Sequence, residues 1–236
     1  MIDVIAMIRE NNASTIYEFI SNPWMNPNAK SVIALNRKTE PVWRRIPMLD
    51  ATVFFSSKQG DAWNFFIQLL LQRRDIIIKP DSIALAINCK RFDFALLIAQ
   101  HVNMGDINEL CVFYSSKPKP ILQIAIEKIA PLDIVMAILN RFPNVGGLSN
   151  KLLEFTSPEG FDTMMDAVCK CPGFVVDAET LMIIMRKFKD KDALFFVLKT
   201  IQYTHGAQKL IQVTDDLPRR IASLLDIMGY TVQIVA

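Results

Sequence analysis

Short apolar helical segments that recur at intervals of 29 to 40 residues constrain this chain more than any other feature of its sequence. Each segment has an aspartate at or near its beginning. A repeat of this length predicts helix pairs stacked in series, because one pair cannot bury both of its apolar faces alone. The aspartate is expected to cap the second helix of each pair and to interact with the positive end of its dipole. The five aspartates are Asp61, Asp93, Asp133, Asp162 and Asp192.

Two segments, residues 82–108 and 120–146, show the repeat most clearly. When Ala86 is aligned with Ala125, both segments read apolar-x-apolar-Ala-Ile-polar, followed by a short break, an apolar residue, an aspartate and a second apolar helix. The small alanine is expected to let the first helix of one unit lie close to the next. We therefore predict an all-α fold, a single-domain solenoid of stacked helical hairpins with atypical terminal units.

Other segments extend this helical pattern through most of the chain, with apolar arcs wide enough to pack on two sides. The main predicted helices cover residues 61–72, 92–101, 131–140, 161–169, 178–188 and 192–202. Helix starts are indicated by a capping box of Thr15 with Glu18, by Asp81, by Ser157 before Pro158, and by Asp177. Strand signals are weak: residues 75–79 suit an extended loop, and residues 230–235 have strand propensity and suit an extended tail.

The least regular stretch covers residues 22–50 and contains four of the chain's prolines, Pro23, Pro27, Pro41 and Pro47. Prolines at this density prevent a long helix. We expect an elaborated loop here, so that residues 1–50 form an N-terminal helix pair with a proline-rich loop. Residues 51–236 are then expected to form one continuous array of helical repeats.

Simple counts argue against two classes of protein. The longest unbroken apolar runs have about six residues, whereas a membrane helix needs roughly 18–20, so we expect no membrane span. Four cysteines in 236 residues do not form a disulfide framework. We therefore expect reduced thiols in an intracellular protein of the cytoplasm. The formal net charge of +2 is too balanced to imply a polyanionic partner by itself.

Residue types that carry catalysis are scarce in this chain. His101 ends an apolar helix, where it interacts with the negative end of the dipole, and His205 is expected to lie in a loop. Cys169 and Cys171 lack the spacing of a zinc-binding pair, and no glycine-rich phosphate-binding motif is present. We predict a protein that is not an enzyme, with no catalytic residue, no metal and no cofactor.

The densest basic signal lies between residues 28 and 47, where Trp43 stands beside Arg44 and Arg45. An aromatic ring next to guanidinium groups suits a protein-binding hot spot and, less well, a site for single-stranded nucleic acid. A solvated loop with Trp43 packed into the core explains the same residues. We include Trp43, Arg44 and Arg45 among the candidate partner-binding residues.

The repeat resembles the ankyrin repeat family. Residues 122–126 read Leu-Gln-Ile-Ala-Ile where the family has Leu-His-Leu-Ala-Ala, and residues 83–87 and 106–108 fit the preceding unit. The resemblance covers residues 51–146, and residues 148–228 follow it by pattern only. This chain departs from the family in lacking the Thr-Pro at the helix start and most of the turn glycines, so plain loops are expected to replace the family's β-hairpins.

The resemblance implies binding to another protein through loop tips and the first helices of successive units, on the concave face of the solenoid. On this chain the implied residues are Lys79, Asp81, Asn88, Lys117, Lys119, Gln123 and Glu127. The expected function is protein–protein recognition, as an adaptor or a subunit of a larger assembly. The alternative is RNA binding by a pentatricopeptide-like helical array, which requires basic side chains along the same face.

Overall fold

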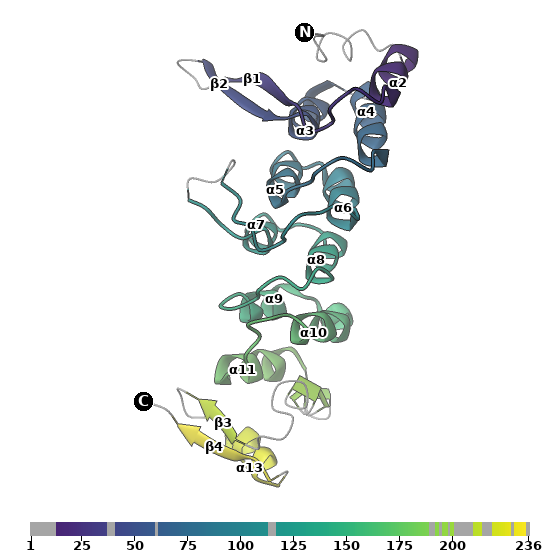
Figure 1. The fold of residues 1–236 in the computed structure, drawn as a ribbon. Helices are drawn as coiled ribbons and strands as arrows, with labels where there is room; N and C mark the ends of the chain where they lie inside the picture. Colours follow the sequence, from purple (N-terminus) through teal and green to yellow (C-terminus); the bar gives the residue numbers. More distant parts are fainter. Residues whose placement is uncertain are drawn as a thin grey trace. The chain divides into compact units, whose positions relative to one another are not determined.

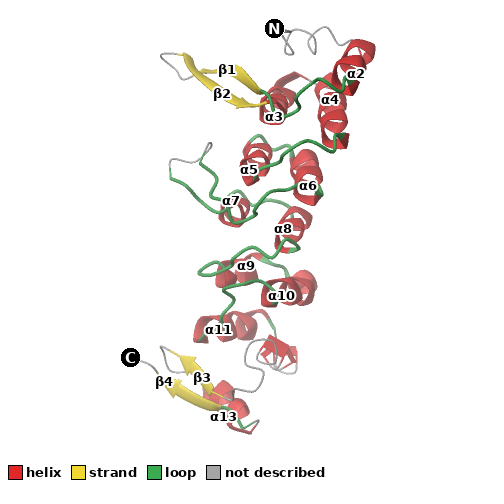
Figure 2. Cartoon of the chain, in the orientation of Figure 1, coloured by secondary structure: helices red, strands yellow, loops and turns green. Residues whose placement is uncertain are grey.

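The structure is a computed structural model of the 236-residue chain. It describes residues 13–36, 41–59, 61–112, 117–188, 192–193, 195–197, 199–200, 210–213, 219–227 and 229–234. Helices predominate among these residues, which confirms the predicted fold class at the level of a mostly helical protein (Figure 2). The chain divides into two compact units, Met1–Ile138 and Leu139–Ala236.

In the first unit, α3 packs against α4, and α5 packs against α6. The first helices of these pairs also meet one another, because α3 contacts α5 and α5 contacts α7 (Figure 1). The elements of this unit are α2 (Ala13–Ser21), β1 (Lys30–Asn36), β2 (Pro41–Pro47), α3 (Met48–Gln59), α4 (Asp61–Gln72), α5 (Pro80–Asn88), α6 (Phe92–Gln100), α7 (Ile121–Glu127) and α8 (Leu132–Leu139), whose last residue belongs to the second unit.

The two aligned segments of the sequence have the same local structure. Ala86 and Ala125 are both fully buried, as small residues between packed helices must be. After each alanine, the backbone N–H five residues later donates to the alanine carbonyl, at 2.8 Å in the first segment and 2.9 Å in the second. The residue before that donor, Lys90 or Ile129, has a left-handed φ of 57° or 52°. This is the Schellman turn in which helices commonly end at glycine.

The aspartates that head the second helices lie slightly further along than expected. Asp93 and Asp133 are each the second residue of α6 and α8, and Arg91 occupies the N-cap of α6. They therefore interact with the positive end of the helix dipole rather than capping it. The predicted capping box at Thr15 is also not at a helix start, because α2 already includes Ala13.

Residues 30–36 and 41–47 form a pair of antiparallel strands, which we call the hairpin, instead of the predicted elaborated loop. The register pairs Lys30 with Pro47 and Asn36 with Pro41. The two prolines are the last and first residues of β2, so they leave the strand interior free to pair, which is where proline is tolerated in a sheet. Helix α3 packs on both strands. The hairpin thus belongs to the first unit.

In the second unit, α9 packs against α10 and α11. The capping box at Asp177 is present, because its carboxylate accepts the backbone N–H of Thr180 at 2.7 Å. β3 and β4 pair in parallel, with Leu210 opposite Thr231. β4 confirms the strand propensity noted near the C-terminus, whereas β3 was not predicted. The elements are α9 (Ser149–Phe155), the 3-10 helix η1 (Pro158–Gly160), α10 (Phe161–Cys169), α11 (Ala178–Lys187), β3 (Leu210–Val213), α13 (Arg219–Ile227) and β4 (Thr231–Ile234).

Candidate interaction surface

The connection between α6 and α7 contains two stretches, residues 109–112 and 117–119, which are joined by an isolated β-bridge and which we call the arm. Cys111 and Lys119 join the stretches by exchanging both backbone hydrogen bonds, at 2.9 and 3.3 Å. The Cys111 side chain is fully buried. The arm is therefore attached to the body of the first unit at this residue, and its other side chains are held in a defined register.

Two ion pairs flank the arm. Lys79, the N-cap of α5, places its Nζ 2.6 Å from Oε1 of Glu109, and this hydrogen bond raises the pKa of Lys79 above its usual value. On the other side, the Lys119 Nζ contacts both carboxylate oxygens of Glu127, at 2.8 and 2.7 Å. Gln123 donates to the same carboxylate at 2.9 Å. Four candidate residues named from the sequence thus take part in two separate contacts at the arm: Lys79 in the first, and Lys119, Gln123 and Glu127 in the second.

The remaining candidates of this set are placed less uniformly. Asp81 lies in the first turn of α5, close enough for its charge to act on Lys79 and Cys111. Lys117 is an exposed residue of the arm. Asn88 is the last residue of α5 and therefore lies at the end of the helix opposite Asp81. The structure separates it from the other candidates.

Two apolar side chains of the arm are exposed, and their positions alternate with that of the buried Cys111. Leu110 is 47% exposed and Val112 is 59% exposed, on either side of the buried Cys111. Exposed and buried positions alternate because successive side chains of an extended chain belong to opposite faces. The sequence did not reveal this surface, since residues 110–112 are apolar throughout and show no alternation of polarity.

The thiol of Cys111 is suited to packing rather than to chemistry. Burial, together with the smaller effect of the carboxylates of Asp81 and Glu109, raises its pKa to about 12. A thiol becomes a strong nucleophile only as its thiolate, so Cys111 is protonated and unreactive at neutral pH. It anchors the arm through its buried side chain and its two backbone bonds.

A buried carboxylate lies beneath the beginning of α5. Asp50 of α3 is only 2% exposed and accepts a hydrogen bond of 2.5 Å from the Ser82 hydroxyl of α5. Burial raises the pKa of Asp50 from 3.8 to about 6; the Ser82 bond opposes this shift, and the charge of Asp81 adds to it. The contact between α3 and α5 therefore contains a group that titrates near neutral pH.

The basic candidates lie on the hairpin. Trp43, Arg44 and Arg45 are consecutive residues of β2, opposite Ala34, Ile33 and Val32 of β1. Because successive strand residues belong to opposite faces, Trp43 and Arg45 share one face of the hairpin and Arg44 belongs to the other. Their side chains lie outside the described part of the structure, and the strand positions alone divide the expected cluster.

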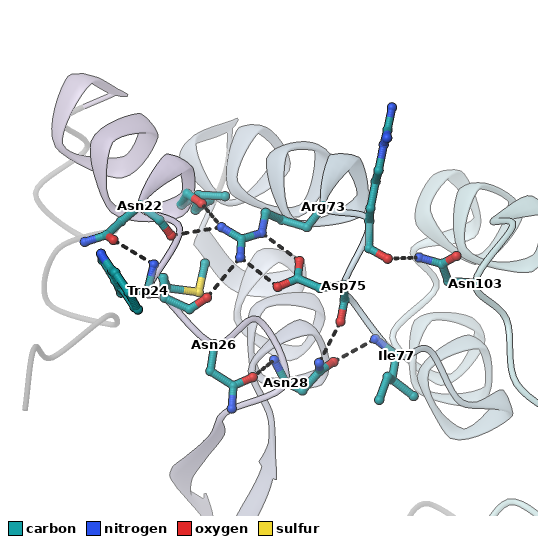
Figure 3. A network of polar contacts seen from close by, with 11 residues as sticks. Asn22, Trp24, Asn26, Asn28, Arg73, Asp75, Ile77 and Asn103 are labelled. Carbon is teal, nitrogen blue, oxygen red and sulfur yellow. Dashed lines mark hydrogen bonds and ion pairs between the residues drawn. The ribbon is translucent and has the colours of Figure 1, made fainter.

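A polar network holds the turn between α2 and β1 against the start of the α4–α5 connection (Figure 3). The Arg73 guanidinium donates to the carbonyl oxygens of Ile20, Asn22 and Met25 at 2.7 to 3.0 Å. It also forms a bidentate ion pair with the Asp75 carboxylate, which holds the pKa of that group below its usual value. This network is structural, since it satisfies backbone carbonyls that a loop would otherwise leave to water.

Trp24 lies on this turn, and its side chain is 92% exposed. The Asn22 side chain accepts the Trp24 backbone N–H at 2.9 Å, and Asn28 joins the turn to Asp75 and Ile77 (Figure 3). A fully exposed tryptophan on a fixed turn is unusual, because most of its large ring normally packs. The sequence predicts a loop around Trp24 but contains no signal for its exposure.

The second unit has a shallow hollow of about 330 Å³ between α9 and α11, lined by Glu154, Ile183, Arg186 and Lys187. Its polar groups are engaged with one another. The Lys187 Nζ donates to the carbonyl oxygens of Glu154 and Thr156 at 2.9 and 2.7 Å, and Arg186 pairs with Glu154 at 3.3 Å. Lys187 thus satisfies carbonyls at the end of α9, which is a common role for a basic residue there.

Two kinds of site are absent from the part of the chain that the structure describes. Here, no group of three or more His, Cys, Asp or Glu side chains is arranged to hold a metal ion. In the same described residues, none of the helices combines the length and apolar character needed to cross a bilayer. No family model matches the chain, and neither a curated protein nor a solved structure matches it. The likeness to ankyrin repeats therefore remains a resemblance of sequence pattern.

Proposed function

We propose that this chain is a non-enzymatic protein–protein interaction module, an adaptor or a subunit of a larger assembly, which binds its partner through the arm and the adjoining beginnings of α5 and α7. In this proposal the helix pairs are ankyrin-like repeats, and the arm takes the place of a loop tip in that family. The contacts of α3 with α5 and of α5 with α7 support a serial arrangement of first helices within the first unit.

The observation that carries the proposal is the pair of exposed apolar side chains, Leu110 and Val112, on an arm whose residues Glu109 and Lys119 form ion pairs. Protein interfaces have an apolar centre surrounded by a polar rim. Here Lys79–Glu109 and Lys119–Glu127 provide polar groups next to the apolar pair. The hydrogen bonds of the arm hold these side chains in place before a partner arrives, which lowers the entropy lost on binding.

The charges of this surface favour a protein partner over RNA. An RNA-binding face requires cations that are free to contact phosphates. Lys79 and Lys119 are each paired with a glutamate, so binding a phosphate would require breaking these pairs or placing phosphate beside a carboxylate. A partner surface with mixed charge and apolar side chains meets no such repulsion.

Replacing both exposed apolar residues of the arm tests the proposal. Wild type and the double variant Leu110→Ser/Val112→Ser are used to capture proteins from the cells that express the chain, with quantification by mass spectrometry. Two apolar interface residues are worth on the order of 1 kcal/mol each, so retention of the true partner is expected to fall about tenfold or more. Cross-links from Lys117 or Lys119 to that partner identify the surface directly.

The matched control replaces two valines that lie elsewhere and are more exposed than the arm residues, as Val102→Ser/Val175→Ser. It is expected to retain the partner at the wild-type level. A second variant, Trp43→Ala/Arg44→Ala, tests whether the hairpin contributes. The proposal is wrong if the arm variant retains every partner of the wild type, or if arm and control variants lose them equally. Retention of RNA that falls steeply with salt supports the alternative instead.

A further inference from the structure

The Cys111–Lys119 pair determines which backbone groups of the arm face outward. When two residues of antiparallel stretches exchange both hydrogen bonds, the N–H and C=O groups of the residues on either side point to the opposite edge. Cys111 exchanges both bonds with Lys119, so the backbone groups of Leu110 and Val112 point to the outer edge. Across the described residues, no protein group forms a hydrogen bond with them. This edge presents two donors and two acceptors.

The opposite edge of the arm is blocked. Its outward positions, on either side of Lys119, are Pro118 and Pro120, and proline has no N–H to donate. The carbonyl of Pro120 is already occupied by the N–H of Ile124 at 3.2 Å. Proline at an edge is one of the devices that prevent a strand from being added there. The arm therefore has one blocked edge and one open edge.

The side chains at the open edge suit an added strand. Leu110 and Val112 are two residues apart in an extended stretch, so they belong to the same face. A strand that pairs with them places alternate side chains against this apolar pair, and such cross-strand contacts between apolar residues stabilise sheets. The nearby charges already form ion pairs at Glu109 and Lys119, so an uncharged, apolar-alternating segment fits better than a charged one.

We propose that the arm binds its partner by strand addition: an extended segment of the partner protein pairs its backbone with Leu110 and Val112 at the open edge. This inference rests on the proposed function and identifies the chemistry of the partner. A second copy of this chain is a poorer occupant, since a two-residue edge buries far less than the roughly 800 Å² per partner typical of stable interfaces. An extended peptide needs only the backbone pairing and the adjacent side-chain contacts.

Amide hydrogen exchange of the full chain, resolved by NMR, tests the backbone pairing. The probe is a pool of capped seven-residue peptides in which apolar residues alternate with threonine, at about 1 mM. The comparison pool is identical but N-methylated at alternate residues, which removes the pairing donors. When the peptide concentration is four times the dissociation constant, amide exchange at Leu110 and Val112 is expected to slow about fivefold. The reason is that the fraction of protein without bound peptide falls by the factor 1 + [L]/Kd. The N-methylated pool is expected to have no effect.

Cys111 provides an internal reference, because its N–H is already bonded to Lys119 and is expected to exchange slowly with or without peptide. The substitution Val112→Lys adds a charge to the open edge and is expected to abolish the protection of Leu110 by the probe. Val102→Lys, at an exposed site outside the arm, is the matched control and is expected to preserve it.

Three results overturn the inference: no slowing at Leu110 and Val112, equal slowing by the N-methylated pool, or slowing that depends on protein concentration without peptide, which indicates pairing between copies. These results are separable from failure of the proposed function. If Leu110→Ser/Val112→Ser loses the cellular partner while the amides stay unprotected, the surface binds through its side chains and only strand addition is wrong. If the partner survives that substitution, the proposed surface itself is wrong.

Discussion

The two aligned segments of the first unit, α5–α6 and α7–α8, share a turn but differ in what their first helices bury. Both place a buried alanine and a left-handed residue at equivalent positions. However, α5 contributes the hydroxyl of Ser82 to a buried hydrogen bond with Asp50, whereas the buried residues of α7 are all apolar. The repeat thus specifies the local backbone, and each interface between neighbouring helices is adjusted separately by the residues that fill it.

The largest expected effect is a pH dependence confined to the interface between α3 and α5. With a pKa of about 6 in the folded state and 3.8 as the unfolded reference, Asp50 is protonated in both states below pH about 4. Between these values the folded state holds the extra proton, so stability falls as pH rises and is lowest above pH about 6. The total loss is on the order of 3 kcal/mol. Denaturant unfolding of wild type and Asp50→Asn across this range measures it.

Asp50→Asn keeps an acceptor for Ser82 and removes the charge, so its advantage over wild type is expected to grow between pH 4 and 6 and then level off. Ser82→Ala is the companion variant. It removes the hydrogen bond that lowers the pKa of Asp50, so its loss of stability is expected to continue to higher pH. An unchanging difference between wild type and Asp50→Asn across the range would refute a raised pKa in this contact.

An intermediate effect is expected at the shared turn. Ile129 and Lys90 both have φ above 50°, a conformation that costs L-residues about 1–2 kcal/mol and β-branched residues the most. Ile129→Gly is expected to stabilise the chain by about 1 kcal/mol, after the entropy that glycine adds to the unfolded state is subtracted. Lys90→Gly is expected to stabilise the chain by a smaller amount. Thermal and denaturant midpoints of the two variants decide between this order and its reverse.

The smallest effect is expected at the ion pairs that flank the arm. Lys119 contacts both oxygens of Glu127 and is less exposed than Lys79, which contacts one oxygen of Glu109. Exposed pairs contribute about 0–1 kcal/mol and are screened by salt. At low salt, Lys119→Met is therefore expected to lower the free energy of unfolding more than Lys79→Met does. This difference between the two variants is expected to disappear at high salt. A difference that persists at high salt would point to packing rather than charge.

The sequence predicted the helices well and the interfaces poorly. The predicted segments 61–72 and 161–169 coincide with α4 and α10, because a 3.6-residue apolar period and a leading aspartate are local signals. The sequence did not predict the hairpin of β1 and β2, because the density of prolines favoured an irregular loop. Two of these prolines are in fact the first and last residues of β2. The turns at Lys90 and Ile129 were not predicted, because neither position is a glycine. There the neighbouring hydrogen bonds impose a backbone conformation that the residue itself disfavours.

Part of the candidate surface was also predictable. Lys79, Lys119, Gln123 and Glu127 were implied by the resemblance to ankyrin repeats. In the structure Lys79 contacts Glu109 of the arm, and Lys119 and Gln123 both contact Glu127. The exposure of Leu110 and Val112 depends on which way a short extended stretch faces, and this is fixed by Cys111 and its distant partner Lys119. No local pattern encodes such a pairing. The same holds for Trp24, whose turn depends on Arg73.

That turn has a consequence for the order in which the chain is made. The carbonyl oxygens of Ile20, Asn22 and Met25 precede Arg73 by 53, 51 and 48 residues. During N-to-C synthesis these oxygens are bound to water until the ribosome has released Arg73 together with its ion-pair partner Asp75. The N-terminal helix α2 can form early, yet it acquires its fixed place only after α4 has been translated.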